Sequence, residues 1–314
     1  LSQANLRALA LTGNGVGVSF LSLCRLRTTI KGLDKLPLLH HLMRVCPLPE
    51  LQFEKLFVAM RKSILVNLDD IGSFPELIYF LSTISLNCFV NEYAYAESDQ
   101  ETYLVEELGE KITQTLAKSE QPEITEILCL ASYRQLHQYH WCSKLESLDS
   151  LEEVKKRLIE EPLLEKMIAK DIPVLEEISD NISLKVRKQC EENPYPRWIK
   201  LGVSIHSKTS AEVCDELNLQ LQSKNIRNFT SPIILIAGCG TGQHSIGAAS
   251  YFSNCHVTAV DLSLASLAYA KRKSIELCLN NIDYVHADIL KLHQMDKEFH
   301  LIESAGVLII WKIR

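Results

Sequence analysis

The pattern of apolar and polar positions changes near residue 232. Up to there, apolar side chains recur mostly at helical spacing, and the runs end at prolines or polar turns. Beyond it, short apolar runs typical of buried strands alternate with amphipathic helical stretches. The sequence therefore predicts an all-helical domain followed by an α/β domain, whose parallel sheet is joined by right-handed crossovers.

The helical part shows short breaks between its stretches of helical spacing. Helices are predicted over residues 50–65, 75–95, 100–117, 122–142, 151–160, 162–170, 183–191 and 210–222. Helices of this length with short breaks are typical of antiparallel hairpins or of a small solenoid. No clean repeat of fixed period recurs, so a repeat array stays one of these two interpretations.

In the last third, predicted strands and helices alternate. Strands are predicted over residues 232–237, 256–260, 282–287 and 299–304, and helices over 243–252 and 263–279. The chain is therefore expected to have four parts. They are a poorly defined N-terminal segment (1–45), an all-helical domain (46–180), a connecting segment (181–228) and an α/β domain (229–314).

The first predicted strand leads into a glycine-rich loop. Ala237, Gly238, Cys239, Gly240 and Gly242 belong to this loop, and a helix follows at once. Glycine lets the backbone turn sharply and approach a ligand that a Cβ atom would hold off. The helix N-terminus adds unpaired N–H groups on the same side. Because a tight structural turn uses the same residues, the loop needs further support as a binding site.

Two acids at strand ends give that support. Asp261 closes the second predicted strand, where a carboxylate accepts hydrogen bonds from a ribose diol, and Asp288 closes the third. Ligands of open α/β sheets bind at the carboxyl ends of the strands. An isolated acid there is often only a helix cap, whereas two acids in register with the loop favour a cofactor. The rival is a nicotinamide cofactor, whose fingerprint requires glycine where this chain has Gln243.

These motifs resemble those of class I S-adenosylmethionine-dependent methyltransferases. The matching stretches are residues 235–242, 260–263 and 287–290. The closer similarity is to bacterial proteins that join tetratricopeptide-like helical repeats to a methyltransferase domain. The resemblance implies a Rossmann-like methyltransferase domain with S-adenosyl-L-methionine as its cofactor. It assigns the glycine loop to the methionine part, Asp261 to the ribose with Leu262 beside it, and Asp288 with Ile289 to the adenine.

A proline-rich segment and a further acid are additional candidates. Residues 193–198 read Asn-Pro-Tyr-Pro-Arg-Trp, and the two prolines disfavour regular helix. We interpret this segment either as a lid, with Tyr195 or Arg197 near the cofactor carboxylate, or as a plain linker. Its order and position differ from the Asn-Pro-Pro-Tyr motif of amino-group methyltransferases, so that chemistry is not carried over. Glu303, which closes the fourth strand, is a candidate for the methionine end or a plain strand-end acid.

Composition and charge narrow the expected partners. The net charge of −6 gives no reason to expect nucleic acid, and no stretch is long and apolar enough to span a membrane. The ten cysteines are scattered without a C-x-x-C pair, so we expect buried thiols, a cytoplasmic location and no metal site. Acidic side chains outnumber basic ones over residues 67–130, which is typical of a solvated face or of a docking surface for a basic protein partner.

The two ends of the chain predict a cut sequence. The first residue is Leu rather than Met. After Gly306-Val307-Leu308 the family usually continues His-His-Met, an acidic residue and Pro, whereas residues 309–314 read Ile-Ile-Trp-Lys-Ile-Arg. A codon series for His-His-Met-Glu-Asp-Pro that loses its first nucleotide encodes these six residues. We therefore expect a frameshift after Leu308, a truncated sheet of strands one to four, and an unpaired apolar edge at strand four.

Three functions follow from these features. The first is an S-adenosylmethionine-dependent methyltransferase with an unassigned acceptor, a protein among the candidates, and weak or no activity in its truncated form. Its helical domain would then select the partner or substrate. The alternative is a helical protein-interaction scaffold with a non-catalytic cofactor-binding remnant. A nicotinamide oxidoreductase is the least favoured. No catalytic residue is assigned from the sequence.

Overall fold

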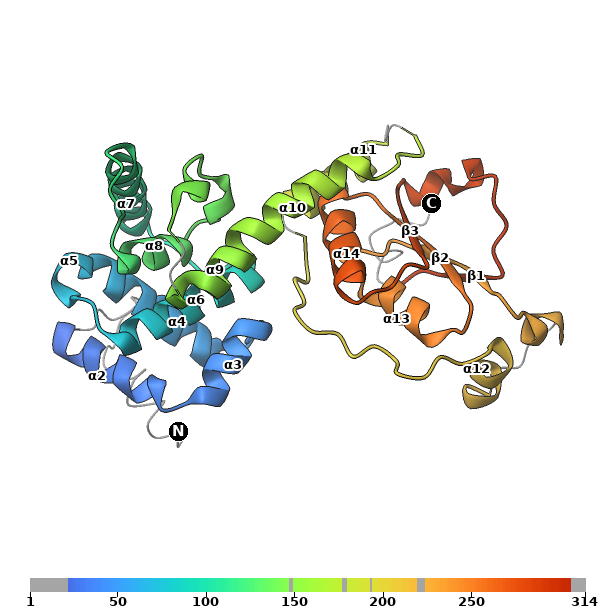
Figure 1. Ribbon diagram of the computed structural model, residues 1–314, viewed down its shortest axis with the longest axis horizontal. Helices are drawn as coiled ribbons and strands as arrows, with labels where there is room; N and C mark the ends of the chain where they lie inside the picture. The colour runs from blue at the N-terminus through green and yellow to red at the C-terminus, as the bar shows by residue number, and fades with distance from the viewer. Residues whose placement is uncertain (1–21, 147–148, 177–179, 193, 219–223, 306–314) are drawn as a thin grey trace. The chain divides into compact units, whose positions relative to one another are not determined.

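The computed structural model describes residues 22–146, 149–176, 180–192, 194–218 and 224–305. It divides into two compact units, Leu1–Leu163 and Leu164–Arg314 (Figure 1). This division lies earlier than the predicted limit at residue 180, because Glu165 and Ile172 pack with the second unit. The other predicted domain limits stay predictions.

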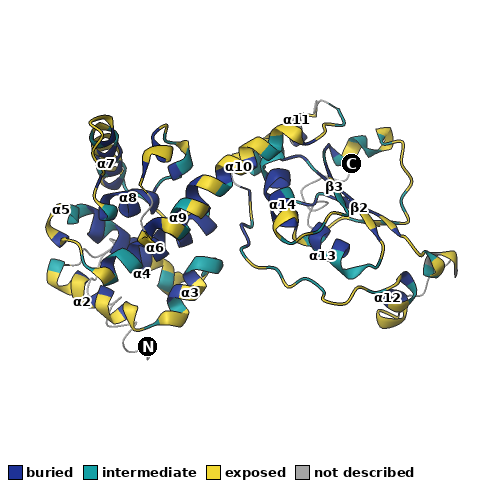
Figure 2. Cartoon of the chain, in the orientation of Figure 1, coloured by how far each residue is buried: buried dark blue, intermediate teal, exposed yellow. Residues whose placement is uncertain are grey.

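The first unit is a helical bundle built around one buried helix. Its helices are α2 (Leu23–Asp34), α3 (Pro37–Val45), α4 (Leu51–Val66), α5 (Leu68–Ile71), α6 (Pro75–Val90), α7 (Asp99–Ala117), α8 (Ile124–Ala131) and α9 (Glu152–Lys155). Every side chain of α6 from Phe80 to Val90 is buried (Figure 2). A helix that is apolar all round belongs in a core, and α6 accordingly packs against α2, α3 and α8. The tetratricopeptide-like assignment stays a prediction.

Four predicted helices differ from the structure in their limits. The helix predicted to reach residue 95 ends at Val90, because Glu92 and Tyr93 adopt positive φ. The helix predicted to reach Cys142 ends at Ala131 and is followed by short 3-10 turns. Conversely, the two helices predicted over 151–170 run on as α9, a π-helical turn (Lys156–Glu160) and α10 (Glu161–Ile168). The extra residue of the π turn lies just before Pro162, which lacks a backbone donor.

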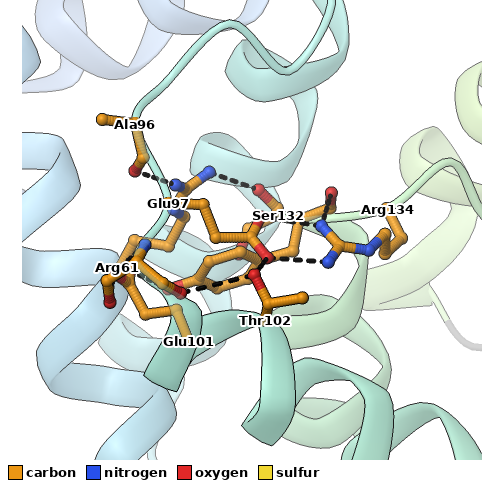
Figure 3. A network of polar contacts seen from close by, with 9 residues as sticks. Arg61, Ala96, Glu97, Glu101, Thr102, Ser132 and Arg134 are labelled. Atoms are coloured by element: carbon orange, nitrogen blue, oxygen red, sulfur yellow. Dashed lines mark hydrogen bonds and ion pairs between the residues drawn. The ribbon is translucent and has the colours of Figure 1, made fainter.

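A buried arginine holds two loops of the first unit against α4 (Figure 3). The guanidinium of Arg61, only 2% exposed, donates to the carbonyls of Ser132 (3.1 Å) and Ala96 (2.9 Å). It also lies over the Tyr133 ring, 4.0 Å from the ring centre. The Tyr133 hydroxyl in turn donates to Glu101 at 3.0 Å. The two terminal guanidinium nitrogens of Arg61 and the Tyr133 hydroxyl thus find partners inside the protein, as most buried polar groups do.

The second unit contains a parallel sheet of four described strands, as the sequence predicts. The strands are β1 (Ile233–Ala237), β2 (His256–Asp261), β3 (Ile282–His286) and β4 (Leu301–Glu303), in the order β3-β2-β1-β4. All three pairings are parallel. The helices of this unit are α11 (Asn181–Glu192), α12 (Ser210–Glu216), α13 (Gln243–Tyr251) and α14 (Leu264–Glu276). Apolar residues of β1, β2, α13 and α14 form its main core.

The two edges of this sheet differ. An extended segment covers the β3 edge, because His286 N–H donates to the Pro173 carbonyl (2.9 Å) and Leu175 N–H donates to the His286 carbonyl (3.0 Å). On the other side, β4 is the outer strand of the described sheet, and Ile302 is 63% exposed. The tail for which the frameshift is predicted, residues 306–314, lies outside the described residues.

Membrane-spanning helices and metal-binding clusters are both absent from the described part of the chain. Within the residues described here, no helix is both long and apolar enough to cross a membrane. Over the same residues, no group of three or more His, Cys, Asp or Glu side chains is arranged to hold a metal ion. All ten cysteines are free, and six of them are buried.

Candidate functional site

The glycine loop leaves β1 at Ala237 and turns in the left-handed region of backbone space. Gly238, Gly240 and Gly242 have φ values of 77°, 51° and 88°, which residues with a side chain rarely adopt. The N–H groups of Gly238 and Cys239 both donate to the Val260 carbonyl of β2 at 2.9 Å. The loop is thereby fixed between the ends of β1 and β2, as the sequence predicts.

Two of these glycines are needed for different reasons. A Cβ atom on Gly242 would lie 2.5 Å from the Cβ of Ala270, so Gly242 allows α13 to begin directly against α14. A Cβ atom on Gly240 would meet no atom within 4 Å. Gly240 therefore faces open space at the sheet's carboxyl edge, where a ligand can approach the backbone closely.

Asp261 connects the glycine loop to the start of α14. Its Oδ2 accepts a hydrogen bond from the N–H of Gly240 (2.8 Å), and its Oδ1 accepts one from the N–H of Ser263 (2.9 Å). Burial raises the pKa of the Asp261 carboxyl above its usual value, and these backbone hydrogen bonds oppose that shift. An ionised carboxylate offers about four lone-pair sites, so Asp261 retains capacity to accept hydrogen bonds from a ligand.

Asp288 occupies the corresponding place after β3, and it is 4% exposed. Its Oδ1 accepts from the N–H of Leu290 (2.9 Å), which caps the short 3-10 helix that begins at Ile289. Its Oδ2 accepts from the hydroxyl of Ser183 on α11 at 2.5 Å. Between the two acids, the carbonyl of Leu262 accepts from the Nε2 of His286 (2.8 Å).

Glu303 lies at the carboxyl end of β4, paired in register with Ile236 of β1. Its carboxylate contacts the Nε2 of His244 in the first turn of α13. The next residue, Ser304, donates from its hydroxyl to the Ala237 carbonyl (3.0 Å). Sequence reasoning selected Glu303 and missed His244. The signal for His244 is its place two residues after Gly242, at the N-terminus that follows the loop.

The proline-rich segment is attached to the glycine loop. The Thr241 hydroxyl donates to the Pro196 carbonyl (2.8 Å), and the indole N–H of Trp198 donates to the Thr241 carbonyl (2.9 Å). Arg197 is 6% exposed and forms an ion pair with Glu165 (3.7 Å). Sequence reasoning missed both Trp198 and Thr241, since their pairing spans more than forty residues.

The two residues proposed as a lid lie in different surroundings. Tyr195 is 60% exposed, whereas the Arg197 guanidinium lies over the ring of Tyr269, 5.8 Å from its centre. Tyr269 also donates from its hydroxyl to the Trp198 carbonyl, which secures the segment to α14. Asn193, the first residue of the predicted lid, lies outside the described residues. The function of this segment as a lid stays a prediction.

Comparisons with known proteins agree with the motif assignment. Residues 234–313 match the model of a family described as a methyltransferase domain. One curated relative, (S)-tetrahydroprotoberberine N-methyltransferase 2 of Papaver bracteatum, is 26% identical over 122 residues, which are 38% of this chain and 34% of the relative. The chain therefore spans about a third of the length of that relative.

Two solved structures are also similar. One is described as an S-adenosyl-L-methionine-dependent methyltransferase from Methanococcus maripaludis (18% identity, 44% of this chain, 56% of that chain, TM-score 0.25). The other is a coclaurine N-methyltransferase bound to N-methylheliamine and S-adenosylhomocysteine (14% identity, 79% and 55%, TM-score 0.25). The family match and the curated relative indicate a methyltransferase domain over the C-terminal region of the chain.

Proposed function

We propose that this chain transfers a methyl group from S-adenosyl-L-methionine to a nucleophilic acceptor at the carboxyl edge of its sheet. In this proposal the loop from Ala237 to Gly242 faces the methionine part of the cofactor. Asp261 with Leu262 holds the ribose, and Asp288 with Ile289 holds the adenine. The observation that supports this best is the open space at Gly240 directly beside the Asp261 carboxylate.

The residues at this edge fit the cofactor chemically. The cofactor, when bound, supplies an electrophilic methyl group on a positively charged sulfur. The chain's own contribution is to bind and orient, because such a transfer depends mainly on holding the reacting atoms in line. Asp261 retains lone pairs for a diol, and the first-turn N–H groups of α13 are unpaired donors by helix geometry.

We further propose that the acceptor atom is an amine nitrogen. The curated relative is named as an N-methyltransferase, which supports this assignment. The His244–Glu303 pair supports it too, since it lies where β4 and α13 meet the loop and offers a base for the proton that a methylated amine releases.

The helical unit is proposed to select the molecule that carries this nitrogen, a protein partner among the candidates. Glu106, Glu107 and Glu110 are exposed on α7, which supports docking of a basic partner. Cross-linking the chain to lysine-rich peptides would test this, and charge reversal at these three residues would abolish the cross-links.

Isothermal titration calorimetry with S-adenosylhomocysteine tests the cofactor assignment. We expect binding by the wild-type chain and at least tenfold weaker binding by Asp261→Ala, because a charged acceptor for the ribose is lost. Asp283→Ala is the matched control, since Asp283 is exposed on β3 and pairs with His256. No binding of S-adenosylhomocysteine by the wild-type chain, or binding of a nicotinamide dinucleotide instead, would refute the proposal.

A transfer assay with labelled cofactor separates the two functional candidates. Label transferred to small amines or lysine-rich peptides would support the methyltransferase. Cofactor binding without transfer to any acceptor in the panel would favour the alternative, a helical scaffold with a non-catalytic cofactor-binding remnant.

A further inference from the structure

Helix α11, which packs against α14 in the second unit, makes side-chain hydrogen bonds near each of its ends. Near its start, Ser183 donates from its hydroxyl to Oδ2 of Asp288 (2.5 Å), and Ser183 is fully buried. Near its end, the carboxylate of Glu191 accepts hydrogen bonds from the N–H groups of Leu264 (2.6 Å) and Ala265 (3.1 Å). α11 therefore reaches both of the strand-end loops that contain the candidate cofactor acids.

The second contact is linked to Asp261 through a single residue. Ser263 is the N-cap of α14, its N–H donates to Asp261, and its hydroxyl donates to the Cys190 carbonyl of α11 (3.1 Å). Glu191 accepts from the next two N–H groups, which have no partner within α14 itself. A carboxylate at this position also interacts favourably with the helix dipole. The turn that aims Asp261 is thus held by α11 from outside.

Over the described side chains of α11, polar contacts rather than apolar burial hold the helix in place. Among its described side chains, residues 183–192, Ser183 alone is buried, and Leu184 is 40% exposed. A helix attached with so little buried apolar surface has a low free energy of local opening. The hydrogen bonds of Ser183 and Glu191, together with the one from Ser263 to the Cys190 carbonyl, therefore help to keep α11 closed over these loops.

We propose that Ser183 and Glu191 are positioning residues of the cofactor site. Ser183 orients the Asp288 carboxylate toward the adenine, and Glu191 fixes the turn that orients Asp261 toward the ribose. α11 then forms a closing wall for the adenosine half of the cofactor, and cofactor binding and α11 closure stabilise each other. This inference rests on the proposed function and goes beyond it, because neither residue belongs to the glycine loop or to the strand ends.

Binding of S-adenosylhomocysteine to matched variants tests the proposal. Ser183→Ala and Glu191→Gln are each expected to weaken binding about tenfold, the size expected when a hydrogen bond to a charged group is lost. Glu192→Gln is the control, since it removes the same charge from the neighbouring, exposed residue of the same helix. The affinity of this control variant for S-adenosylhomocysteine is expected to stay within twofold of the wild-type value. Methylthioadenosine lacks the amino-acid part of the cofactor. Its affinity should fall by the same factors in Ser183→Ala and Glu191→Gln.

A double-mutant cycle separates positioning from general support of the fold. If Ser183 acts through Asp288, Ser183→Ala has no further effect on affinity in an Asp288→Asn background. A purely structural role for Ser183 would make the two losses add. Hydrogen exchange provides a second readout, because S-adenosylhomocysteine should slow the exchange of α11 amides in the wild type and not in Glu191→Gln. If Ser183→Ala does not fold, Glu191→Gln and the exchange measurement still test the proposal.

The outcomes distinguish this inference from the proposed function. Wild-type binding with unchanged affinity in both variants, or fully additive losses in the cycle, would overturn the inference and leave the proposed function standing. Absence of S-adenosylhomocysteine binding by the wild type would overturn both.

Discussion

The two units bury polar groups for opposite purposes. In the first unit, the Arg61 guanidinium donates to two backbone carbonyls and lies over an aromatic ring. In the second unit, Asp261 accepts hydrogen bonds from backbone N–H groups of the loops on either side of it, and the neighbouring Gly240 faces open space. Burial and charge alone therefore do not mark a functional site. A buried charge with spare hydrogen-bonding capacity beside open space does.

Removing the buried Arg61 side chain should have the largest effect on stability. Arg61→Ala leaves the carbonyls of Ser132 and Ala96 without their donors and opens a cavity beside Tyr133. We expect the free energy of opening of the first unit to fall by about 3 kcal/mol. Hydrogen exchange of the α6 amides measures it. Lys55→Ala is the control, because Lys55 is exposed and lies on α4, the helix that carries Arg61.

The same variant tests whether the units serve separate purposes. Because Arg61 contacts only residues of the first unit in the hydrogen bonds described, Arg61→Ala should leave the affinity for S-adenosylhomocysteine within twofold of the wild type. A large loss of affinity would show that the first unit's network also supports the cofactor site.

Two glycines in one loop should respond differently to the same substitution. Gly242→Ala combines a left-handed φ with a 2.5 Å approach to Ala270, so we expect it to destabilise the second unit by about 3 kcal/mol. Gly240→Ala meets no atom and should cost only about 1 kcal/mol of stability. Its new methyl group points into the space proposed for the cofactor, so affinity should fall more than tenfold. Chemical denaturation measures the loss of stability, and calorimetry measures the loss of affinity. Equal losses of stability and of affinity in the two variants would contradict these separate roles of Gly240 and Gly242.

The sequence predicted the parts of the site that depend on local pattern. The strands, the glycine loop and the strand-end positions of Asp261 and Asp288 follow from short-range periodicity and from the rule that ligands bind at carboxyl ends of parallel strands. The sheet order β3-β2-β1-β4 and the spare space at Gly240 do not follow from such patterns. They depend on packing between segments that are far apart along the chain.

The residues that sequence reasoning missed share this dependence on distant partners. Trp198 donates to Thr241, and Glu191 accepts from the start of α14. His244 meets Glu303 only because β4 pairs with β1. Helical spacing likewise could not identify α6 as the centre of its unit, since an apolar stretch shows that a helix is buried but not against which neighbours.

A matched pair of tryptophans extends the comparison to single hydrogen bonds. The indole N–H of Trp198 donates to the Thr241 carbonyl (2.9 Å), and that of Trp141 donates to the Thr113 hydroxyl (2.8 Å). Each Trp→Phe change should lower the free energy of unfolding of the unit that contains it by about 1 kcal/mol. Only Trp198→Phe should also weaken S-adenosylhomocysteine binding, by about fivefold, because it loosens the glycine loop. Unchanged affinity would contradict a contribution of the proline-rich segment to the site.

The smallest expected effects come from acidification. Through Glu97 and Asp261, a fall in pH should change the stability of the two units with opposite sign. Burial alone would raise the pKa of Glu97, but the hydrogen bonds from Arg134 and Thr102 and the positive charges of Arg134 and Arg61 together outweigh burial and lower the pKa. Glu97 therefore stabilises the first unit above the unfolded-state pKa, and this contribution is lost as the pH falls through the lowered value. The Asp261 pKa is raised by burial. Its charge therefore destabilises the second unit at neutral pH, and this cost is relieved as the pH falls through the raised value.

Cofactor affinity should follow Asp261 and not Glu97. Protonation removes acceptor capacity from the carboxyl, so affinity for S-adenosylhomocysteine should fall a few-fold as the pH is lowered from neutral through the raised pKa of Asp261. Asp261→Asn should bind weakly with little dependence on pH over this range. Glu97→Gln should leave the wild-type profile intact and should reduce the acid sensitivity of the first unit, followed by hydrogen exchange of α7. A pH dependence of affinity that persists in Asp261→Asn would contradict the assignment of this dependence to Asp261.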